Sequence, residues 1–209
     1  MDEKGFIRRI HQEDFAQALG LSPELKYQRR GTDGRRIDAS AVASLLAKTE
    51  QPSTSVLQFL KFTPFDLLIG NVDAHAKNHA VIYYSGRIAP RLAPRYDLLP
   101  TRMEQNITEQ LSYNIGAAQY IETVDGVAVA KFMSSFGIAT ARGQKRILSE
   151  RLSKLVLPLA ANLEILQSLG QKSFADLIAT NMRLLLPKFD FPIPAEAQSQ
   201  DTFILRGGG

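Results

Sequence analysis

Cysteine is absent from this sequence of 209 residues, and its absence narrows the chemistry open to the chain. Without thiols the chain can form neither disulfides nor thiolate metal sites. Apolar runs as long as a membrane span are absent too. The N-terminal stretch MDEKGFIRRIHQEDF is charged throughout and has no apolar signal core. We therefore expect a cytoplasmic protein that makes no contact with a membrane.

Charge of one sign is in only slight excess. The formal net charge is +4, with 44% apolar and 22% charged residues, which is ordinary for a globular protein of one large or two small domains. The densest basic run, KYQRRGTDGRR (residues 26–36), suits a contact with phosphate or nucleic acid, although a solvated loop explains it more simply. No helix-turn-helix, zinc-finger or RNA-binding signature accompanies it, so we expect no direct binding of nucleic acid.

The organisation along the chain is mainly α-helical with a small β-hairpin in the middle. The runs HAVIYY and RIAPRLAP flank the turn pair Ser85-Gly86 and predict the hairpin, and EQLSYNIG predicts one more short strand. Pro64 falls inside a helical pattern, where the lost hydrogen bond predicts a kink or two abutting helices, and Pro158 should kink its helix. We expect one domain over residues 1–189 and a flexible tail, residues 190–209. Helical periodicity covers residues 11–20, 38–48, 53–71, 127–137, 141–170 and 173–189.

Candidate functional residues gather in one stretch, GNVDAHAKNHAVIYYSGRIAPRLAPRYDLLP, residues 70–100. It contains His75 and His79, whose spacing is that of two zinc ligands on one helical face. A metallohydrolase of that type also needs a glutamate beside the first histidine, where this chain has Ala76. A small metal-dependent hydrolase is therefore the weakest hypothesis for this stretch.

Phosphoryl transfer explains the stretch better. It requires an aspartate that orients or deprotonates the acceptor hydroxyl, and oxygen ligands that hold Mg²⁺ against the nucleotide phosphates. In protein kinases the catalytic-loop aspartate lies five residues before the metal-binding asparagine, and a second metal-binding aspartate follows. Here Asp73 lies five residues before Asn78, and Asp97 follows the predicted hairpin. Plainer roles stay open: Asp73 and Asn78 suit turns, Asp97 a helix cap and His75 a buried position.

These motifs resemble a known family. LIGNVDAHAKNHAV followed by LAPRYDLLP is similar to the catalytic and metal-binding segments of the HipA family of serine/threonine kinases, which are bacterial toxins of type II toxin–antitoxin modules. HQEDFAQALG resembles the motif just upstream. The resemblance covers residues 10–186 and is close over residues 10–20 and 65–100. It implies a kinase-like C-terminal lobe that uses Mg²⁺ and ATP, with a protein substrate and an antitoxin-like DNA-binding protein as a partner.

The resemblance also implies roles for single residues. Asp73 would be the catalytic aspartate. Asn78 and Asp97 would hold Mg²⁺ and, through it, the nucleotide. His75 would brace the catalytic loop, and Lys77 would lie beside the phosphates or the acceptor.

The sequence departs from the family pattern upstream of these motifs. A complete member carries an N-terminal region with a glycine-rich phosphate loop and a nucleotide-binding lysine, whereas only nine residues precede Ile10 here. We expect a C-terminal lobe that is inactive without a separate N-terminal lobe. The alternatives are a catalytically silent binding module that engages an antitoxin-like partner and, less favoured, the hydrolase.

Overall fold

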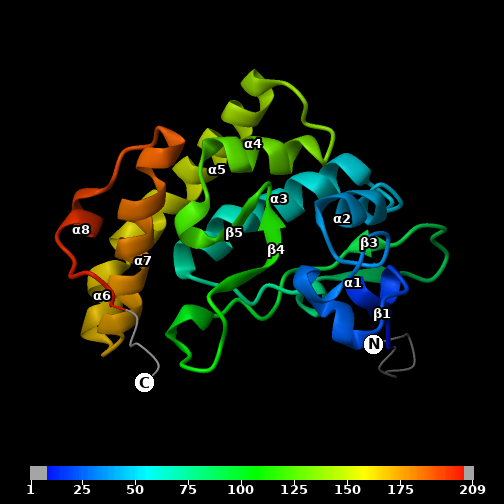
Figure 1. Cartoon of the computed structure of the whole chain (residues 1–209), viewed down its shortest axis with the longest axis horizontal. Helices are drawn as coiled ribbons and strands as arrows, with labels where there is room; N and C mark the ends of the chain where they lie inside the picture. Colours follow the sequence, from blue (N-terminus) through cyan, green and yellow to red (C-terminus); the bar gives the residue numbers. More distant parts are fainter. Residues whose placement is uncertain (1–8, 205–209) are drawn as a thin grey trace, which may run out of the picture.

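Residues 9–204 are described by the computed structural model of the chain, in which helices predominate and two small antiparallel sheets lie between them (Figure 1). The expected architecture, mainly α with a small β-hairpin, is confirmed. The elements in chain order are β1 (His11–Asp14), α1 (Phe15–Ala18), η1 (Pro23–Lys26), η2 (Gln28–Arg30), α2 (Ala39–Leu46), α3 (Pro52–Ile69), η3 (Ala76–Asn78), β2 (Ala80–Tyr83), β3 (Arg91–Leu92), η4 (Thr101–Met103), β4 (Gln110–Ile115), β5 (Ala118–Tyr120), η5 (Ile121–Thr123), α4 (Gly126–Ser134), α5 (Ala141–Ala161), α6 (Leu163–Ser168), α7 (Lys172–Leu185), η6 (Pro187–Phe189) and α8 (Ala195–Gln198).

The three-stranded sheet has the order β1-β2-β3, with antiparallel pairing throughout. Strands β2 and β3 form the predicted hairpin, in which Val81 pairs with Leu92. A second sheet joins β4, which the sequence predicts, to β5. Figure 1 shows the first sheet at one end of the molecule with α1 and α2, and α6, α7 and α8 at the other end.

The prediction of a helix over residues 11–20 is wrong for its first part. Residues 11–14 form β1, whose backbone groups pair with β2. Asp14 ends this strand and caps α1, because its carboxylate accepts the N–H of Gln17 at 2.9 Å while the Gln17 side chain accepts the N–H of Asp14. This reciprocal cap starts the helix at Phe15.

The two internal prolines do not divide their helices, so the alternative of two abutting helices at Pro64 is wrong, while the kinks expected at Pro64 and Pro158 stay predictions. Helix α3 continues through Pro64 and α5 continues through Pro158. A proline inside a helix costs about 3 kcal/mol. In α3 this cost is offset by burial, since Pro64 and its neighbours Thr63, Leu67 and Leu68 all lie in the interior.

An aromatic cluster forms the part of the core that packs against the functional stretch, residues 70–100, at His79. Phe59 of α3 lies at its centre, with ring centroids 6.2 Å from Phe15, 6.1 Å from Tyr113, 6.5 Å from Phe132 and 5.4 Å from Phe136. These rings come from α1, α3, β4, α4 and the turn after α4, so one cluster joins elements far apart in the sequence.

The C-terminal segment is folded further than the sequence predicts. Instead of a loose tail from residue 190, the chain forms α8, in which Ala197 is fully buried. The Arg183 guanidinium of α7 donates to the carbonyl oxygens of Ala197 and Gln200, the latter at 3.0 Å. Residues 205–209 of the predicted tail lie outside the described residues. Among the helices of residues 9–204, none is long and apolar enough to cross a membrane.

Candidate active site

The functional stretch begins where α3 ends. Gly70 terminates the helix in a left-handed conformation, φ 76°, and a side chain there would meet Leu177. The next residue, Asn71, is bonded back to the helix, because its side-chain amide donates a hydrogen bond to the Asp66 carboxylate at 2.9 Å. The end of α3 is therefore tied to the start of the loop, residues 70–79, that follows it.

Two hydroxyl groups hold this loop from outside. Thr101 Oγ1 accepts hydrogen bonds from the backbone N–H groups of Val72, at 3.0 Å, and Asp73, at 3.2 Å. On β4 the Ser112 hydroxyl and N–H both donate to the Val72 carbonyl, at 2.9 and 3.0 Å. These bonds fix the backbone at Val72 and at the N–H of Asp73, which limits how far the Asp73 carboxylate can move. Sequence reasoning missed Thr101 and Ser112, because neither carries a motif.

Asp73, Asn78 and Asp97 converge in one place. The Asn78 Nδ2 atom donates to Asp97 Oδ2 at 2.6 Å and lies 3.5 Å from the Asp73 carbonyl oxygen. All three residues line a cavity of about 490 Å³, whose other walls come from residues 99–107 and the start of α7. The structure thus brings together the three residues that the sequence singles out for acid–base and metal chemistry.

The donors in this cavity suit a hard cation such as Mg²⁺. They are the carboxylate oxygens of Asp73 and Asp97 and the amide oxygen of Asn78. The amide oxygen is available for a cation, because the hydrogen bond to Asp97 uses the Nδ2 atom of Asn78. Mg²⁺ takes such oxygens in small number and keeps water and phosphate as its remaining ligands. Asp97 is held with φ 58°, a conformation uncommon outside glycine, and such strain clusters at functional sites.

A buried ion pair lies behind the loop. Arg95 Nη2 donates to both carboxylate oxygens of Asp66, at 3.1 and 3.2 Å, and the two side chains are 5% and 7% exposed. Arg95 Nη1 lies 2.7 Å from a ring nitrogen of His79. Since His79 follows Asn78 and Arg95 precedes Asp97 by two residues, this cluster joins the two halves of the site.

Burial dominates the protonation of this cluster. It raises the pKa of Asp66 from 3.8 to about 6, although Arg95 and the Asn71 amide favour the carboxylate. Burial and the Arg95 charge hold the pKa of His79 well below its ordinary value, so His79 is neutral.

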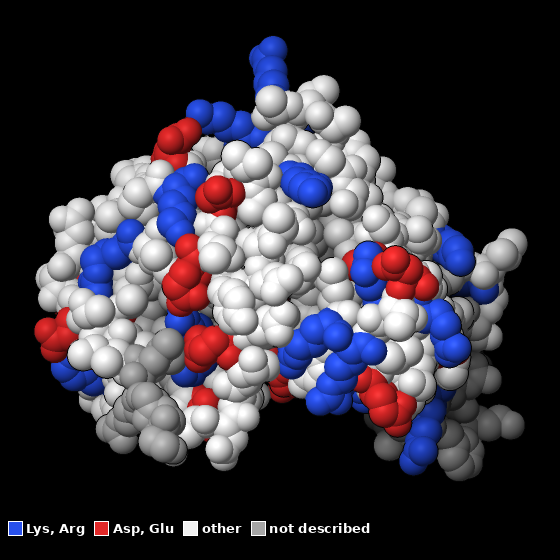
Figure 2. Space-filling model, viewed as in Figure 1, with Lys and Arg blue, Asp and Glu red and all other residues white. Residues whose placement is uncertain are grey.

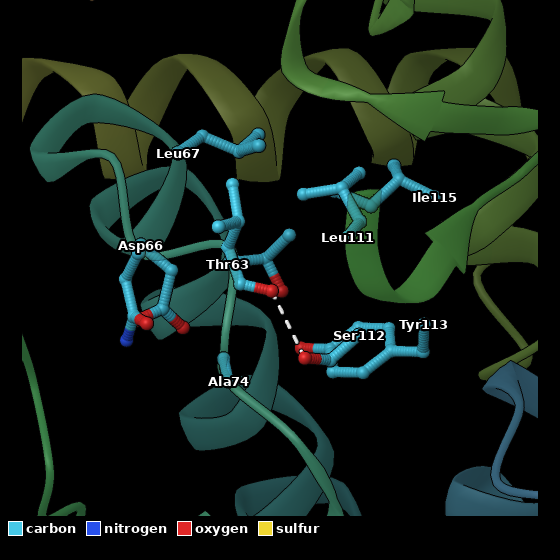
Figure 3. Close-up of a pocket in the computed structure, with 10 residues that line it drawn as sticks. Thr63, Asp66, Leu67, Ala74, Leu111, Ser112, Tyr113 and Ile115 are labelled. Atoms are coloured by element: carbon cyan, nitrogen blue, oxygen red, sulfur yellow. Dashed lines mark hydrogen bonds between the residues drawn. The ribbon is translucent and has the colours of Figure 1, made fainter. Parts of the chain in front are cut away.

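Figure 3 shows Asp66 and Thr63 of α3 on one side of a small cavity of about 20 Å³, across from Ser112 and the other labelled residues of β4.

His75 and Lys77 lie on the loop but outside the cavity. Lys77 binds the carboxylate of Asp14 at 2.9 Å and is 41% exposed. The His75 ring packs against Tyr27, with ring centroids 5.3 Å apart, and its Nε2 lies 2.8 Å from the ammonium of Lys26. Because a charged lysine only donates, His75 accepts here as a neutral imidazole. Burial also lowers its pKa.

The histidines do not form a zinc site. His79 stacks on Phe15 and packs at a tilt against Phe59, with centroids 5.1 Å from each, and contacts Arg95, whereas His75 faces Lys26. Within residues 9–204 no group of three or more His, Cys, Asp or Glu side chains is placed to hold a metal ion. The hydrolase hypothesis therefore gains no support from the structure.

Lys26 and Tyr27 are further residues at the site that the motifs did not reveal. Both belong to the basic run 26–36, which the sequence explains most simply as a solvated loop. Tyr27 interacts with the Asp73 carboxylate, and burial together with this interaction raises the pKa of Tyr27 to about 12. The high density of charge in the run was the sequence signal that pointed to it. The contact between the run and the loop forms only in the folded structure and cannot be predicted from that signal.

Comparisons with known proteins point to one family. The family model described as HipA-like C-terminal domain matches residues 1–157. The chain is 34% identical over 146 residues to "Putative kinase Y4mE" of Sinorhizobium fredii, covering 70% of this chain and 34% of that protein. It is 31% identical over 139 residues to "Serine/threonine-protein kinase toxin HipA" of Shewanella oneidensis, covering 63% of this chain and 32% of the toxin.

A solved structure extends the similarity to nearly the whole chain. In the complex of Shewanella oneidensis HipA, HipB and operator DNA, the similar chain superposes with a TM-score of 0.73 at 27% identity, covering 91% of this chain and 47% of that one. The chain thus spans about a third of the length of the curated relatives and about half of the chain of known structure.

Proposed function

Because the chain belongs to the HipA-like C-terminal domain family, we propose that it is the catalytic and metal-binding part of a protein serine/threonine kinase. The observation that carries the proposal is the convergence of Asp73, Asn78 and Asp97 on one cavity, in the order and spacing that protein kinases use for phosphoryl transfer. The relatives named as kinases support the reaction class.

Asp73 has the acid–base role in this proposal. Its backbone is held by Thr101, so its carboxylate stays at the cavity wall, where a serine or threonine hydroxyl can donate to it. Asp73 then orients the hydroxyl oxygen toward the phosphate and accepts its proton. Asn78 and Asp97 present oxygens to the same cavity and would hold Mg²⁺. When bound together with ATP, Mg²⁺ would neutralise part of the negative charge of the phosphates. His75 and Lys77 support the loop through contacts with Lys26 and Asp14.

The residues that would hold the nucleotide from the other side are not among those described. Residues 9–204 contain no glycine-rich loop between a strand and a helix, and the matched relatives are about three times as long as the matched region. We expect this chain alone to bind Mg²⁺–ATP weakly and to transfer phosphate negligibly, because alignment of the reactants is worth about 7–11 kcal/mol of the barrier. Sequence outside these residues, or a separate N-terminal lobe, would supply that alignment.

Reconstitution tests the proposal. The N-terminal region of a relative such as the Shewanella oneidensis toxin is added to the chain, and incorporation of labelled phosphate into protein is measured. Asp73→Asn should abolish transfer and spare nucleotide binding, and Asp97→Asn should weaken Mg²⁺-dependent nucleotide binding. Asp190→Asn, at an exposed aspartate that does not line the cavity, serves as the control. Transfer by the Asp73→Asn protein would refute its role, and robust transfer by the chain alone would refute the need for a second part.

A second candidate is a catalytically silent binding module for an antitoxin-like DNA-binding protein. It is favoured by the solved complex in which the similar chain is assembled with HipB and operator DNA. Binding of such a partner that persists in the Asp73→Asn/Asp97→Asn double variant, with no transfer by the reconstituted wild type, would favour this candidate over the kinase.

A further inference from the structure

We infer that Lys26, Arg29 and Arg30, grouped around Tyr27 beside Asp73, form the subsite that recognises acidic side chains flanking the phosphorylated serine or threonine of a protein substrate. This inference rests on the proposed kinase function and assigns its substrate class. The three cations and Tyr27 are called the basic subsite below.

The basic subsite touches the loop at His75, two residues after Asp73. Lys26 Nζ lies 2.8 Å from His75 Nε2, and the Tyr27 ring packs edge-on against the His75 ring. The cavity that contains Asn78 and Asp97 is lined by Asp73 but by no residue of the range 23–30. Metal-bound phosphate would therefore meet Asp73 from the cavity, which leaves the Tyr27 side for the acceptor chain.

Three positive charges share one aromatic ring. Lys26 Nζ lies 4.9 Å from the Tyr27 ring centroid, Arg29 Cζ lies 4.1 Å from it and Arg30 Cζ lies 5.1 Å from it. The ring attracts each cation, but like charges at this separation repel one another. A bound carboxylate would relieve that repulsion, so the arrangement favours an anionic ligand.

The charges of the subsite have no ion-pair partner within residues 9–204. Arg36, in the same basic run, pairs with Asp33 and Asp38, both at 2.9 Å. Across the described part of the chain no carboxylate forms an ion pair with Lys26, Arg29 or Arg30, and the two arginines are exposed. Figure 2 shows Lys and Arg side chains gathered on this face, over the segment that Figure 1 draws in blue between α1 and α2.

The segment is held in place rather than free to move away. The Gln28 side chain accepts a hydrogen bond from the N–H of Asn114 on β4 at 2.7 Å. Strand β4 also holds the loop through Ser112 and Val72. Because one strand anchors both parts, the distance from the cations to Asp73 is set by the fold, as a substrate subsite requires.

A peptide fits this surface better than nucleic acid does. Affinity for nucleic acid comes mainly from contacts with many phosphates, on the order of 6–10 in a strongly salt-dependent binder, whereas three cations suit one or two carboxylates next to a single hydroxyl. Their position beside Asp73 also matches a residue close to the phosphoacceptor in the substrate chain.

The test measures binding of a labelled nonapeptide with a central serine flanked by aspartates, against the same peptide with asparagines, by fluorescence anisotropy. In the whole 209-residue chain, Arg29→Ala/Arg30→Ala should weaken binding of the acidic peptide by about tenfold. Arg142→Ala/Arg146→Ala, which removes the same charge from exposed positions of α5, should change it less than about twofold. Circular dichroism checks that both variants are folded.

Three results would overturn the inference. Equal losses in the two double variants would show a non-specific charge effect. Tighter binding of a single-stranded oligonucleotide of matched charge, lost in Arg29→Ala/Arg30→Ala, would make this a nucleic-acid surface. If Arg29→Ala/Arg30→Ala raises the KM for ATP in the reconstituted kinase and leaves the KM for the peptide unchanged, the cations contact the nucleotide rather than the peptide. If the reconstituted wild type transfers no phosphate, the proposed function fails, while the anisotropy still decides whether the subsite exists.

Discussion

Replacing Arg95 by methionine should destabilise the protein strongly, because it removes one partner of a buried ion pair. Arg95 makes two hydrogen bonds to Asp66, and both side chains are at least nine-tenths buried. Methionine fills similar volume but leaves the carboxylate with only the Asn71 amide as a donor. Breaking a buried pair in this way costs about 3–5 kcal/mol, a large part of the roughly 5–15 kcal/mol by which a domain is stable.

The loss should depend on pH in a defined direction. Burial raises the pKa of Asp66 from 3.8 to about 6 in the folded protein. A group with a raised folded pKa contributes stability that is fully present below the unfolded pKa and is lost as pH rises through the folded one. Without Arg95 the pKa of Asp66 rises further, so the Arg95→Met protein should be weakest at pH 8 and recover part of its stability at pH 5.5, where Asp66 takes up a proton.

Urea unfolding followed by circular dichroism at pH 5.5 and pH 8 measures this loss. Arg91→Met is the matched control, since Arg91 pairs with Glu50 at the surface, is 47% exposed and should cost no more than about 1 kcal/mol. Adding Asp66→Asn to Arg95→Met removes the unpaired charge and should restore much of the stability at pH 8. A loss below about 1 kcal/mol at pH 8, or an equal loss at both pH values, would refute the reasoning.

Two glycine substitutions test the geometry of the loop itself. Gly70→Ala should destabilise the protein by about 1–3 kcal/mol in thermal melts, because φ is 76° and the new Cβ would lie 2.9 Å from Leu177; Gly34→Ala, with the same φ but open space, should cost less, and equal losses would deny the packing contribution. Asp97→Gly should relieve the strain at φ 58° and leave the melting temperature unchanged or higher, yet weaken Mn²⁺ binding in the presence of ATP, as followed by electron paramagnetic resonance; unchanged binding would exclude Asp97 as a ligand.

The sequence predicts those parts of the candidate site whose residues follow a recognisable spacing along the chain. The spacing of Asp73 and Asn78 and the position of Asp97 after a hairpin are distances along the chain, and the structure brings the three residues together. Their roles remain proposals. The hairpin was equally local, because Ser85-Gly86 specifies the turn.

Where local preference competed with packing, the sequence alone was misleading. Pro64 disfavours a helix by itself, but the burial of α3 outweighs it. Residues 11–14 fit a helical period, yet their backbone finds partners on β2, 66 to 72 positions away. Such outcomes depend on which surfaces meet, and a periodicity measured within one segment does not report this.

The sequence by itself therefore determined the helical class of the protein, the hairpin and the three residues that meet at the cavity, because each follows from neighbours in the chain. Only the tertiary structure decided that Arg95 links Asp66 to His79 behind that site, and that the start of the basic run lies against His75 of the loop. Both depend on long-range contacts, whose partners are chosen by the folded core and by charge at close range.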